Sequence, residues 1–298
     1  MTSLQRVALV VHPTRNIARA VATLERWAGE QGLEFVQLGA DGSRRTVAPA
    51  GTVGEHDLVV ALGGDGTMLA ALRAAAGTRT PVLGVACGSL GAMSAITADE
   101  LDPALDRFRA GEWTVRKLPA LAVESEAGAE WAVNDFVIVR RGPGQIATSV
   151  TVDGELYVRA AGDGLIAATT LGSTAYSMAA GGPVLAVGTA AFVLTPLAMH
   201  GGCAPPLVVP ADATVEVDVE PGYSGYDVEF DGRPRVQRAA PHYTFALHPS
   251  RLSLVTFAKA DRGLAGLRKR GIVTDSPRIL ARDERRGQTP LDQQGLNP

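Results

Sequence analysis

Short apolar runs alternate with amphipathic stretches over the first hundred residues. The run RVALVV is followed by NIARAVATLERWAGEQG, in which Ile17, Val21, Leu24 and Trp27 recur at helical spacing. The segments LEFVQL, DLVVAL, TMLAALRAAAG, PVLGVA and ADELDPALDRFRAG continue the alternation. Strands that alternate with helices predict a parallel sheet covered by helices on both faces. We therefore expect an α/β domain over residues 1–108.

The pattern changes after that point to alternating or β-rich segments separated by turns. SVTVDGELYV has an Asp-Gly pair between two strand-like runs, which is a strong hairpin signal. TVEVDVEPG, YDVEFDG, HYTFAL and RLSLVTF follow. Residues 109–260 are therefore expected to form a β-rich, mostly antiparallel domain. In the remaining extension, 261–298, the stretch ARDERRGQTPLDQQGLNP is polar and without period, which predicts a mobile tail.

Composition and charge exclude several classes of function. The chain has 298 residues, 46% of them hydrophobic and 20% charged, which suits a protein with two buried cores. A net charge of −3 provides no basic field for nucleic acid or an anionic membrane. Two cysteines make no disulfide framework, and the N-terminal MTSLQRVALVVHP lacks the apolar core of a signal peptide. We expect a cytoplasmic protein.

One apolar run ends in glycines with a carboxylate between them. In LGGDGT, Asp65 stands between Gly64 and Gly66, before a helix expected to begin near Thr67. Glycines at a helix N-terminus let backbone amides approach phosphate. The loop lacks the lysine of a Walker A motif and the third glycine of the dinucleotide fingerprint. Because Asp65 would repel phosphate, it accepts a proton from an attacking hydroxyl, holds Mg²⁺, or caps a helix in a tight turn.

Two further segments carry candidate ligand-binding groups. AGDGLIAATTLGSTAYSMAAGGPVL, residues 161–185, combines small residues, which permit close approach, with hydroxyls that direct hydrogen bonds. Its Asp163-Gly164 pair by itself also fits a hairpin turn. In WAVNDFVIVRR, Asn134 and Asp135 interrupt a strand. They form either a turn or bulge, or a polar pair that contacts ribose hydroxyls and base nitrogens.

Together these segments resemble the NAD kinase family. GGDGT, the pair ND, DGLIAATTLGSTAYSMAAGGPVL, PPLVVP and DGR follow one another in the order of the family's motifs. The resemblance covers residues 5–260, and the segment 161–185 is its longest and most specific part. It implies an N-terminal α/β domain, a C-terminal β-rich domain and an active site between them.

The resemblance also implies a reaction, ATP- or polyphosphate-dependent phosphorylation of the adenosine ribose 2′-hydroxyl of NAD to give NADP. Asp65 matches the proposed general base, and Gly64, Gly66 and Thr67 match positions near the donor phosphates. Asn134 and Asp135 match the Asn-Glu pair that holds NAD. The positions implied to line the substrate site are Asp163, Thr174, Ala175, Tyr176 and Ser177. Mg²⁺ would arrive with the triphosphate rather than in a protein cage, and a homodimer or homotetramer is implied.

The chain departs from the family's pattern at several positions. GSLGAMS replaces Gly-Arg-Leu-Gly-Phe, so Ser89 stands for an arginine and Ala92 for an aromatic residue. Leu171 replaces a proline and Asp135 a glutamate. HGGCAPPLVVP keeps His200 but loses the family's serines and, within Cys203 to Pro205, its arginine, which is Ala204 or Pro205 depending on the alignment. These changes bear on donor choice, affinity for NAD and the substrate itself.

Three functions therefore stand beside one another. An NAD kinase is favoured by the order of the motifs. A lipid kinase that shares the GGDG loop is opposed by the STAYS segment and by the lack of a basic amphipathic membrane-docking stretch. A non-catalytic NAD(P)-binding homologue is suggested by the changes at Ser89, Ala92 and 203–205, and opposed by the retained Asp65.

Overall fold

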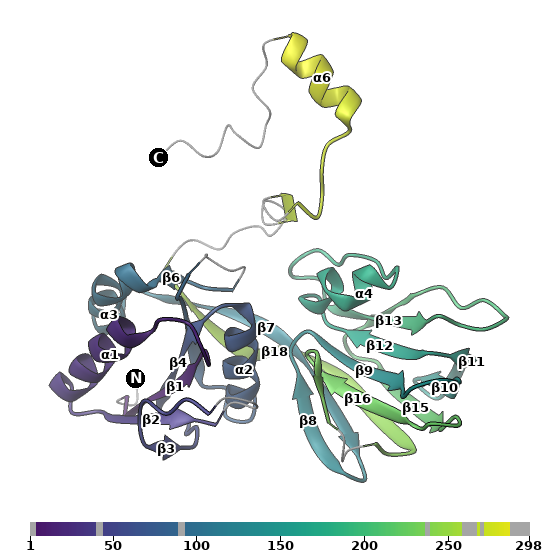
Figure 1. Ribbon diagram of the computed structural model, residues 1–298, viewed down its shortest axis with the longest axis horizontal. Coiled ribbons are helices and arrows are strands. Elements are labelled where there is room, and N and C mark those ends of the chain that lie inside the picture. The colour runs from purple at the N-terminus through teal and green to yellow at the C-terminus, as the bar shows by residue number, and fades with distance from the viewer. Residues whose placement is uncertain are drawn as a thin grey trace.

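Two lobes joined by a pair of long strands make up the computed structural model, which describes residues 4–39, 44–88, 93–235, 239–257, 267–268 and 271–286 (Figure 1). The N-terminal lobe has an open parallel sheet in the order β3-β2-β1-β4-β5. Its strands are β1 (Arg6–Val11), β2 (Glu34–Leu38), β3 (Ala50–Gly51), β4 (Asp57–Gly63), β5 (Pro81–Ala86) and β6 (Ile96–Thr97). Its helices are α1 (Ala18–Glu30), α2 (Asp65–Ala75), the 3₁₀ turn η1 (Ala98–Glu100) and α3 (Leu101–Arg109).

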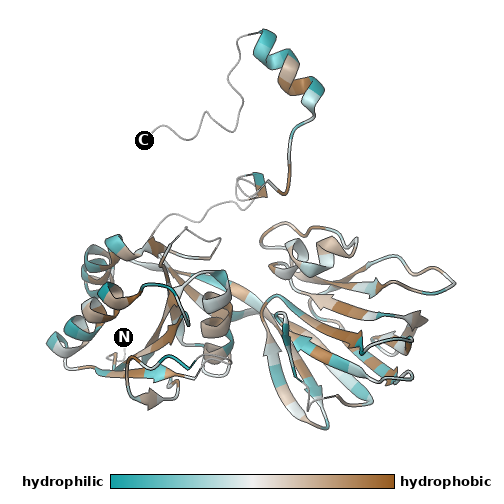
Figure 2. Cartoon of the chain, in the orientation of Figure 1, coloured by the Kyte–Doolittle hydropathy of each residue, from teal (hydrophilic) through white to brown (hydrophobic). Residues whose placement is uncertain are grey.

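Both faces of this parallel sheet are covered, as the apolar runs predict. Val7 and Leu9 of β1 belong to one cluster with residues of α1 and α3. Ala8 and Val10 belong to another cluster with residues of α2. Successive residues of a strand point to opposite faces, so a strand buried on both sides has a continuous apolar sequence. Figure 2 shows these strands as apolar beneath helices whose outer faces are polar.

The C-terminal lobe is a sandwich of two antiparallel layers. One layer continues the large sheet and the other is a separate sheet in the order β14-β13-β12-β9-β16-β17. The strands of the large sheet are β7 (Thr114–Ser125), β8 (Gly128–Ala132), β10 (Ile146–Val152), β11 (Glu155–Gly162), β15 (Thr214–Glu220) and β18 (His242–Thr256). The separate sheet holds β9 (Asp135–Arg140), β12 (Gly164–Ala168), β13 (Ala191–Leu197), β14 (Leu207–Pro210), β16 (Tyr226–Phe230) and β17 (Arg233–Pro234).

An aromatic cluster fills the space between the two layers. Phe136 of the separate sheet lies 5.0 Å from Phe230 and 5.2 Å from Tyr243, measured between ring centroids. The rings of Phe192 and Phe245 also meet between the layers, edge to face, with their centroids 6.3 Å apart. The predicted Asp153-Gly154 hairpin joins β10 and β11, and both turn residues have positive φ, as the tight hairpin turns require.

Strands β7 and β18 connect the lobes. β18 pairs antiparallel with β15 in the C-terminal lobe and parallel with β5 in the N-terminal lobe, and β7 pairs with β18 at both ends. The fold class predicted from the sequence is confirmed by this arrangement. The domain boundary at residues 108 and 109 stays a prediction; it falls in α3, just before β7 begins.

Two predicted boundaries need correction. Helix α2 begins at Asp65 rather than near Thr67, because Gly64 itself is the extended residue that precedes the first turn. Part of the expected aperiodic tail is helical, since α6 spans Pro277–Arg285 with proline in the first turn, where its missing N–H costs no hydrogen bond. Residues 287–298 of that tail lie outside the described residues. Across the described residues, no helix is both long and apolar enough to span a membrane.

Candidate functional site

The glycine loop follows the last residue of β4 at the carboxyl edge of the parallel sheet. Gly64 is extended, and its carbonyl oxygen accepts hydrogen bonds from the amides of Thr67 and Met68, each at 3.0 Å. A Cβ atom on Gly63 would lie 2.2 Å from the Thr67 hydroxyl oxygen. Thr67 is therefore buried against Gly63, and Asp65 and Gly66 are the exposed residues of the loop.

Asp65 is the first residue of α2, not its N-cap. The N-cap position belongs to Gly64, so the interpretation of Asp65 as a capping residue is wrong. Its Oδ1 accepts a hydrogen bond from the Met93 amide at 3.4 Å. A carboxylate in the first turn is stabilised by the helix dipole, and here it also stands exposed at the point where glycines open the backbone.

An arginine that the sequence analysis missed lies against this loop. The guanidinium of Arg15 donates from Nη1 to the carbonyl oxygen of Cys87 at 3.1 Å. A Cβ atom on Gly64 would lie 3.1 Å from the same Nη1, and one on Gly88 3.2 Å from it. Arg15 follows RVALVV at the carboxyl edge of a parallel strand, where ligands of such sheets bind. That position was the signal that could have identified it.

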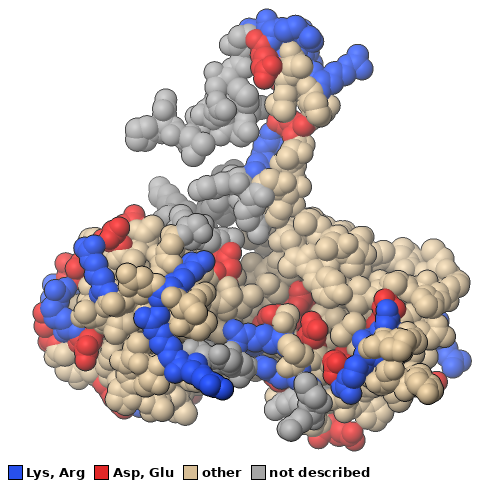
Figure 3. Space-filling model, in the orientation of Figure 1, with Lys and Arg blue, Asp and Glu red and all other residues tan. Residues whose placement is uncertain are grey.

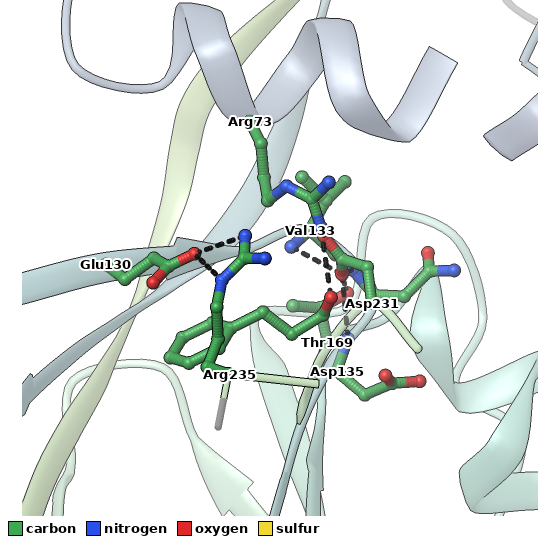
Figure 4. Close-up of polar contacts among 9 residues, drawn as sticks. Arg73, Glu130, Val133, Asp135, Thr169, Asp231 and Arg235 are labelled. Atoms are coloured by element: carbon green, nitrogen blue, oxygen red, sulfur yellow. Dashed lines mark hydrogen bonds and ion pairs between the residues drawn. The ribbon is translucent and has the colours of Figure 1, made fainter. Parts of the chain in front are cut away.

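The polar pair predicted in the second lobe lies where β8 ends and β9 begins. The backbone amides of Val133 and Asn134 donate to Oδ1 of Asp231 at 2.9 and 2.6 Å, and the amide of Asp135 donates to it at 3.3 Å. Figure 4 shows these amides converging on one carboxylate. The interruption of the strand is therefore stabilised: the three successive amides at the break donate to a single side chain instead of to a neighbouring strand.

Asp231 also joins the two lobes. Its Oδ2 lies 3.2 Å from Nη1 of Arg73, which comes from α2 and also donates to the carbonyl oxygen of Phe230 at 3.0 Å (Figure 4). The side chain of Asp231 is fully buried and that of Arg73 is 10% exposed. Burial raises the pKa of the Asp231 carboxyl, while Arg73 and the three amides act against this rise. The helix that begins with Asp65 is thus bonded to the segment that contains Asn134 and Asp135.

The carboxyl group of Asp135 has an unusual environment. The residue is buried, and desolvation raises the pKa of its carboxyl to about 7, with the nearby charges of Asp231 and Glu229 adding to the effect. Figure 4 shows its carboxyl directed away from Asp231. Near neutral pH this group exists in both protonation states, so it can donate a hydrogen bond as well as accept one.

The segment after β12 binds the carbonyl oxygens of the same residues. The buried hydroxyl of Thr169 donates to the Val133 carbonyl oxygen at 2.7 Å, and the Thr169 amide donates to the Asn134 carbonyl oxygen at 2.8 Å. A Cβ atom on Gly172 would lie 2.0 Å from that Asn134 oxygen. Gly172 thus lies against Asn134, and Thr174, Ala175 and Tyr176, none of them buried, follow it within four residues.

Leu171, where the family has a proline, packs against the second core cluster of the N-terminal lobe. That cluster holds residues of α2 together with Val133. Leu171 thus makes an apolar contact between the lobes.

Ser177 differs from its neighbours in the predicted list. It is fully buried, and its hydroxyl is 2.9 Å from that of Thr195 on β13. A Cβ atom on Gly182 would lie 2.3 Å from the Ser177 oxygen, which leaves no room for a ligand on that side. Helix α4 (Tyr176–Ala179) turns this hydroxyl toward the sheet, where it has a structural partner, and its role in substrate binding stays a prediction.

Asp163 lies at the other end of β12 from the polar pair. It stands where the chain crosses from β11 to β12, and its carboxylate forms an ion pair with Arg140. Ala168, at the far end of β12, is the partner of Asp135 in the sheet. Five residues of β12 separate the two positions, which is about 17 Å at about 3.3 Å per residue. The structure thus does not bring Asp163 together with Asn134 and Asp135.

The remaining departures are partly described. Ser89 and Ala92 lie outside the described residues. The Nδ1 atom of His200 is 2.9 Å from the Gln145 side-chain oxygen, and the Pro205 carbonyl oxygen accepts a hydrogen bond from Tyr157. Within the described ranges, no three side chains of His, Cys, Asp or Glu gather in a way that could hold a metal ion.

Comparison with known proteins decides the family. The model of the ATP-NAD kinase N-terminal domain matches residues 45–113, and that of the ATP-NAD kinase C-terminal domain matches residues 133–247. The chain belongs to the NAD kinase family. An NAD kinase from Nitrosomonas europaea is 32% identical over 278 residues, which are 86% of this chain and 93% of the relative.

Solved structures of NAD kinases share the fold. Yeast NADH kinase complexed with NADH superimposes with a TM-score of 0.72 at 20% identity, over 93% of this chain and 90% of that one. An NAD kinase from Archaeoglobus fulgidus in complex with ATP gives a TM-score of 0.67 at 24% identity, over 91% of this chain and all of the other. As a member of the NAD kinase family this chain is a kinase, which decides against the lipid-kinase and non-catalytic interpretations.

Proposed function

We propose that this NAD kinase family member transfers the terminal phosphoryl group of ATP, or a phosphoryl group of polyphosphate, to the 2′-hydroxyl of the adenosine ribose of NAD. The 2′-oxygen forms a bond to phosphorus, the bond from phosphorus to the bridging oxygen breaks, and ADP or shortened polyphosphate leaves. The products are NADP and the donor remnant. The observation that carries the proposal is the exposed Asp65 carboxylate at the opened glycine loop.

Asp65 acts on the acceptor hydroxyl in this proposal. An alcohol is a weak nucleophile, and a positioned carboxylate that takes its proton contributes about 10²–10⁴-fold in rate. Backbone amides of Gly64 and Gly66 at the start of α2 face the donor phosphates, where the helix N-terminus favours negative charge. Thr67 supports this loop from within, because its amide is bonded to the Gly64 carbonyl oxygen. Mg²⁺ enters as part of the donor complex and neutralises charge on the phosphates.

The second lobe holds NAD. Asn134 offers both donors and acceptors to the dinucleotide, and Asp135 offers a carboxyl that can do either near neutral pH. Thr174, Ala175 and Tyr176 line the same side, and the phenol ring of Tyr176, 43% exposed, provides a surface for stacking. Asp163 lies at the far end of β12, so it contacts NAD only if the dinucleotide is bound in an extended form that spans the strand.

Product analysis tests this function directly. Purified protein is incubated with NAD and Mg-ATP, and then with polyphosphate, and NADP is measured with a dehydrogenase specific for NADP. Phosphorus NMR of the product separates a 2′-phosphate from a 3′-phosphate. We expect the 2′-ester; a 3′-ester, or NAD that remains unchanged with both donors, would contradict the proposal.

Association with further copies of the chain is the second part of the proposal. Residues 164–211 contain no Asp, Glu, Lys or Arg, and Figure 3 shows an almost uncharged surface over the part of the C-terminal lobe that includes α4 and β13. Val184, Val187 and Val208 are exposed there. Exposed apolar patches on soluble proteins mark interaction sites, so we propose a homo-oligomer. Light scattering coupled to size exclusion gives its mass, and a monomer at micromolar concentration would exclude it.

A further inference from the structure

Three loops meet at one edge of the N-terminal sheet. Strands β1, β4 and β5 are parallel neighbours, and their pairing aligns Val11 with Leu62 and Gly63 with Ala86. The residues that follow these strands therefore lie side by side. The loop after β4 holds Gly64 and Asp65, which the proposed function assigns to donor and acceptor, whereas the loop after β1 has no assigned role.

The guanidinium of Arg15 lies between the other two loops. It is bonded to the Cys87 carbonyl oxygen after β5, and a side chain at either Gly64 or Gly88 would contact it. Gly64 has φ of −124°, which any residue can adopt. A side chain at this position would therefore be disfavoured by its contact with the Arg15 guanidinium, and not by backbone conformation.

The backbone that carries Arg15 is held in place. Nδ1 of His12 accepts hydrogen bonds from the amides of Thr14 and Arg15 at 3.2 and 3.1 Å. Nη1 of Arg45 donates to the Arg15 carbonyl oxygen at 2.6 Å. Desolvation lowers the pKa of His12, and the charges of Arg15 and Arg45 lower it further. Arg45 thus fixes the backbone of Arg15, whose guanidinium lies against Gly64, the residue that precedes α2.

We propose that Arg15 binds the phosphates of the donor. This inference rests on the proposed function, because it assigns a residue to the donor side of the same site. A guanidinium presents a planar fork of donors that matches phosphate oxygens. Its charge offsets the repulsion that Asp65 exerts on the donor, so Asp65 can take the acceptor proton while the triphosphate lies close to it.

Steady-state kinetics of an arginine series test the assignment. Arg15→Gln is expected to raise the KM for Mg-ATP about tenfold to hundredfold, the loss of one charge-assisted hydrogen bond, while the KM for NAD stays unchanged. Arg15→Lys is expected to recover part of the loss, because lysine keeps the charge but not the fork. The matched control is Arg19→Gln on α1, whose exposed side chain pairs with Asp99 and should leave both constants unchanged.

Two outcomes would overturn the assignment: an unchanged KM for Mg-ATP in Arg15→Gln, or an equal rise in the KM for NAD. Melting curves of each variant identify a loss of folding. Should the unaltered protein form no NADP, the proposed function fails while Arg15 is still tested. Calorimetric titration with Mg-ATP then decides, because equal affinities of the unaltered protein and Arg15→Gln, or no binding by either, would refute the role.

Discussion

The β4–α2 loop and the segment 133–135 both present backbone amides at a break in regular structure, but they do so differently. In the first, glycines open the backbone, and Asp65 and Gly66 are exposed to solvent. In the second, three amides are already satisfied by a buried carboxylate. The first region is therefore open to solvent, which suits its proposed role in binding the donor, while the second uses its donors to fix the positions of Asn134 and Asp135.

This difference separates catalysis from stability. A change in the exposed loop should alter turnover and leave folding intact, because few native contacts depend on it. A change in the buried network should lower the free energy of unfolding, because removing the buried carboxylate leaves its partners without an acceptor. The four predictions that follow test this separation, from the largest expected effect to the smallest.

Asp65→Asn is expected to lower kcat by about 10²–10⁴-fold, because the amide cannot accept the proton of the attacking hydroxyl. The free energy of unfolding in urea should fall by at most about 1 kcal/mol, since the exposed side chain loses only its charge at the helix N-terminus. Asp99→Asn, at another exposed carboxylate of the N-terminal lobe, is the control and should change neither quantity. Turnover within a few-fold of the unaltered protein would exclude Asp65 as the base.

Asp231→Ala is expected to lower the free energy of unfolding by about 3–5 kcal/mol, the usual cost of removing one partner from a buried ion pair. It removes the acceptor of three amides and the contact with Arg73. Asp227→Ala on β16, the strand that Asp231 follows, removes a more exposed pair with Arg141 and should cost much less. Equal losses in the free energy of unfolding of the two variants, measured in urea, would show that the buried network of Asp231 adds no special stability.

Asp135→Asn is expected to change the pH dependence of stability. The carboxyl has a pKa of about 7 in the folded protein and 3.8 as its ordinary value. Between these values the unfolded chain binds fewer protons, so the unaltered protein loses stability as pH rises from about 4 to 7. Relative to it, the Asn variant should gain up to about 4 kcal/mol, at about 1.4 kcal/mol per unit. Urea unfolding at pH 5 and pH 8 measures the gain, and an equal difference at both would contradict it.

Ser177→Ala is expected to cost about 1 kcal/mol, because it leaves the buried hydroxyl of Thr195 without this partner. The KM for NAD and for the donor should stay unchanged. The double variant with Thr195→Val should recover most of the loss, since removing both partners is nearly neutral. A rise in either KM for Ser177→Ala would support the predicted binding role.

Local pattern was enough to predict most of the fold. Apolar runs that alternate with amphipathic stretches determined the parallel sheet, and the Asp-Gly pair between alternating strands determined the β10–β11 hairpin. These features depend on neighbours within a few residues, which the sequence contains. Errors occurred where that pattern is weak: α2 begins at Asp65, earlier than expected, and α6 was missed because its segment is polar and has no apolar period.

The sequence by itself identified the segments to which the proposed function assigns the chemistry: the GGDG loop, the Asn134-Asp135 pair and the small-residue segment 161–185. Tertiary structure decided which side chains of those segments meet. Asp231 reaches amides almost a hundred positions away, Arg15 lies against Gly64 and Gly88, and Ser177 turns inward. The physical reason is that such contacts follow from strand register and from the packing of one lobe on another. Neither leaves a periodic signal in the sequence.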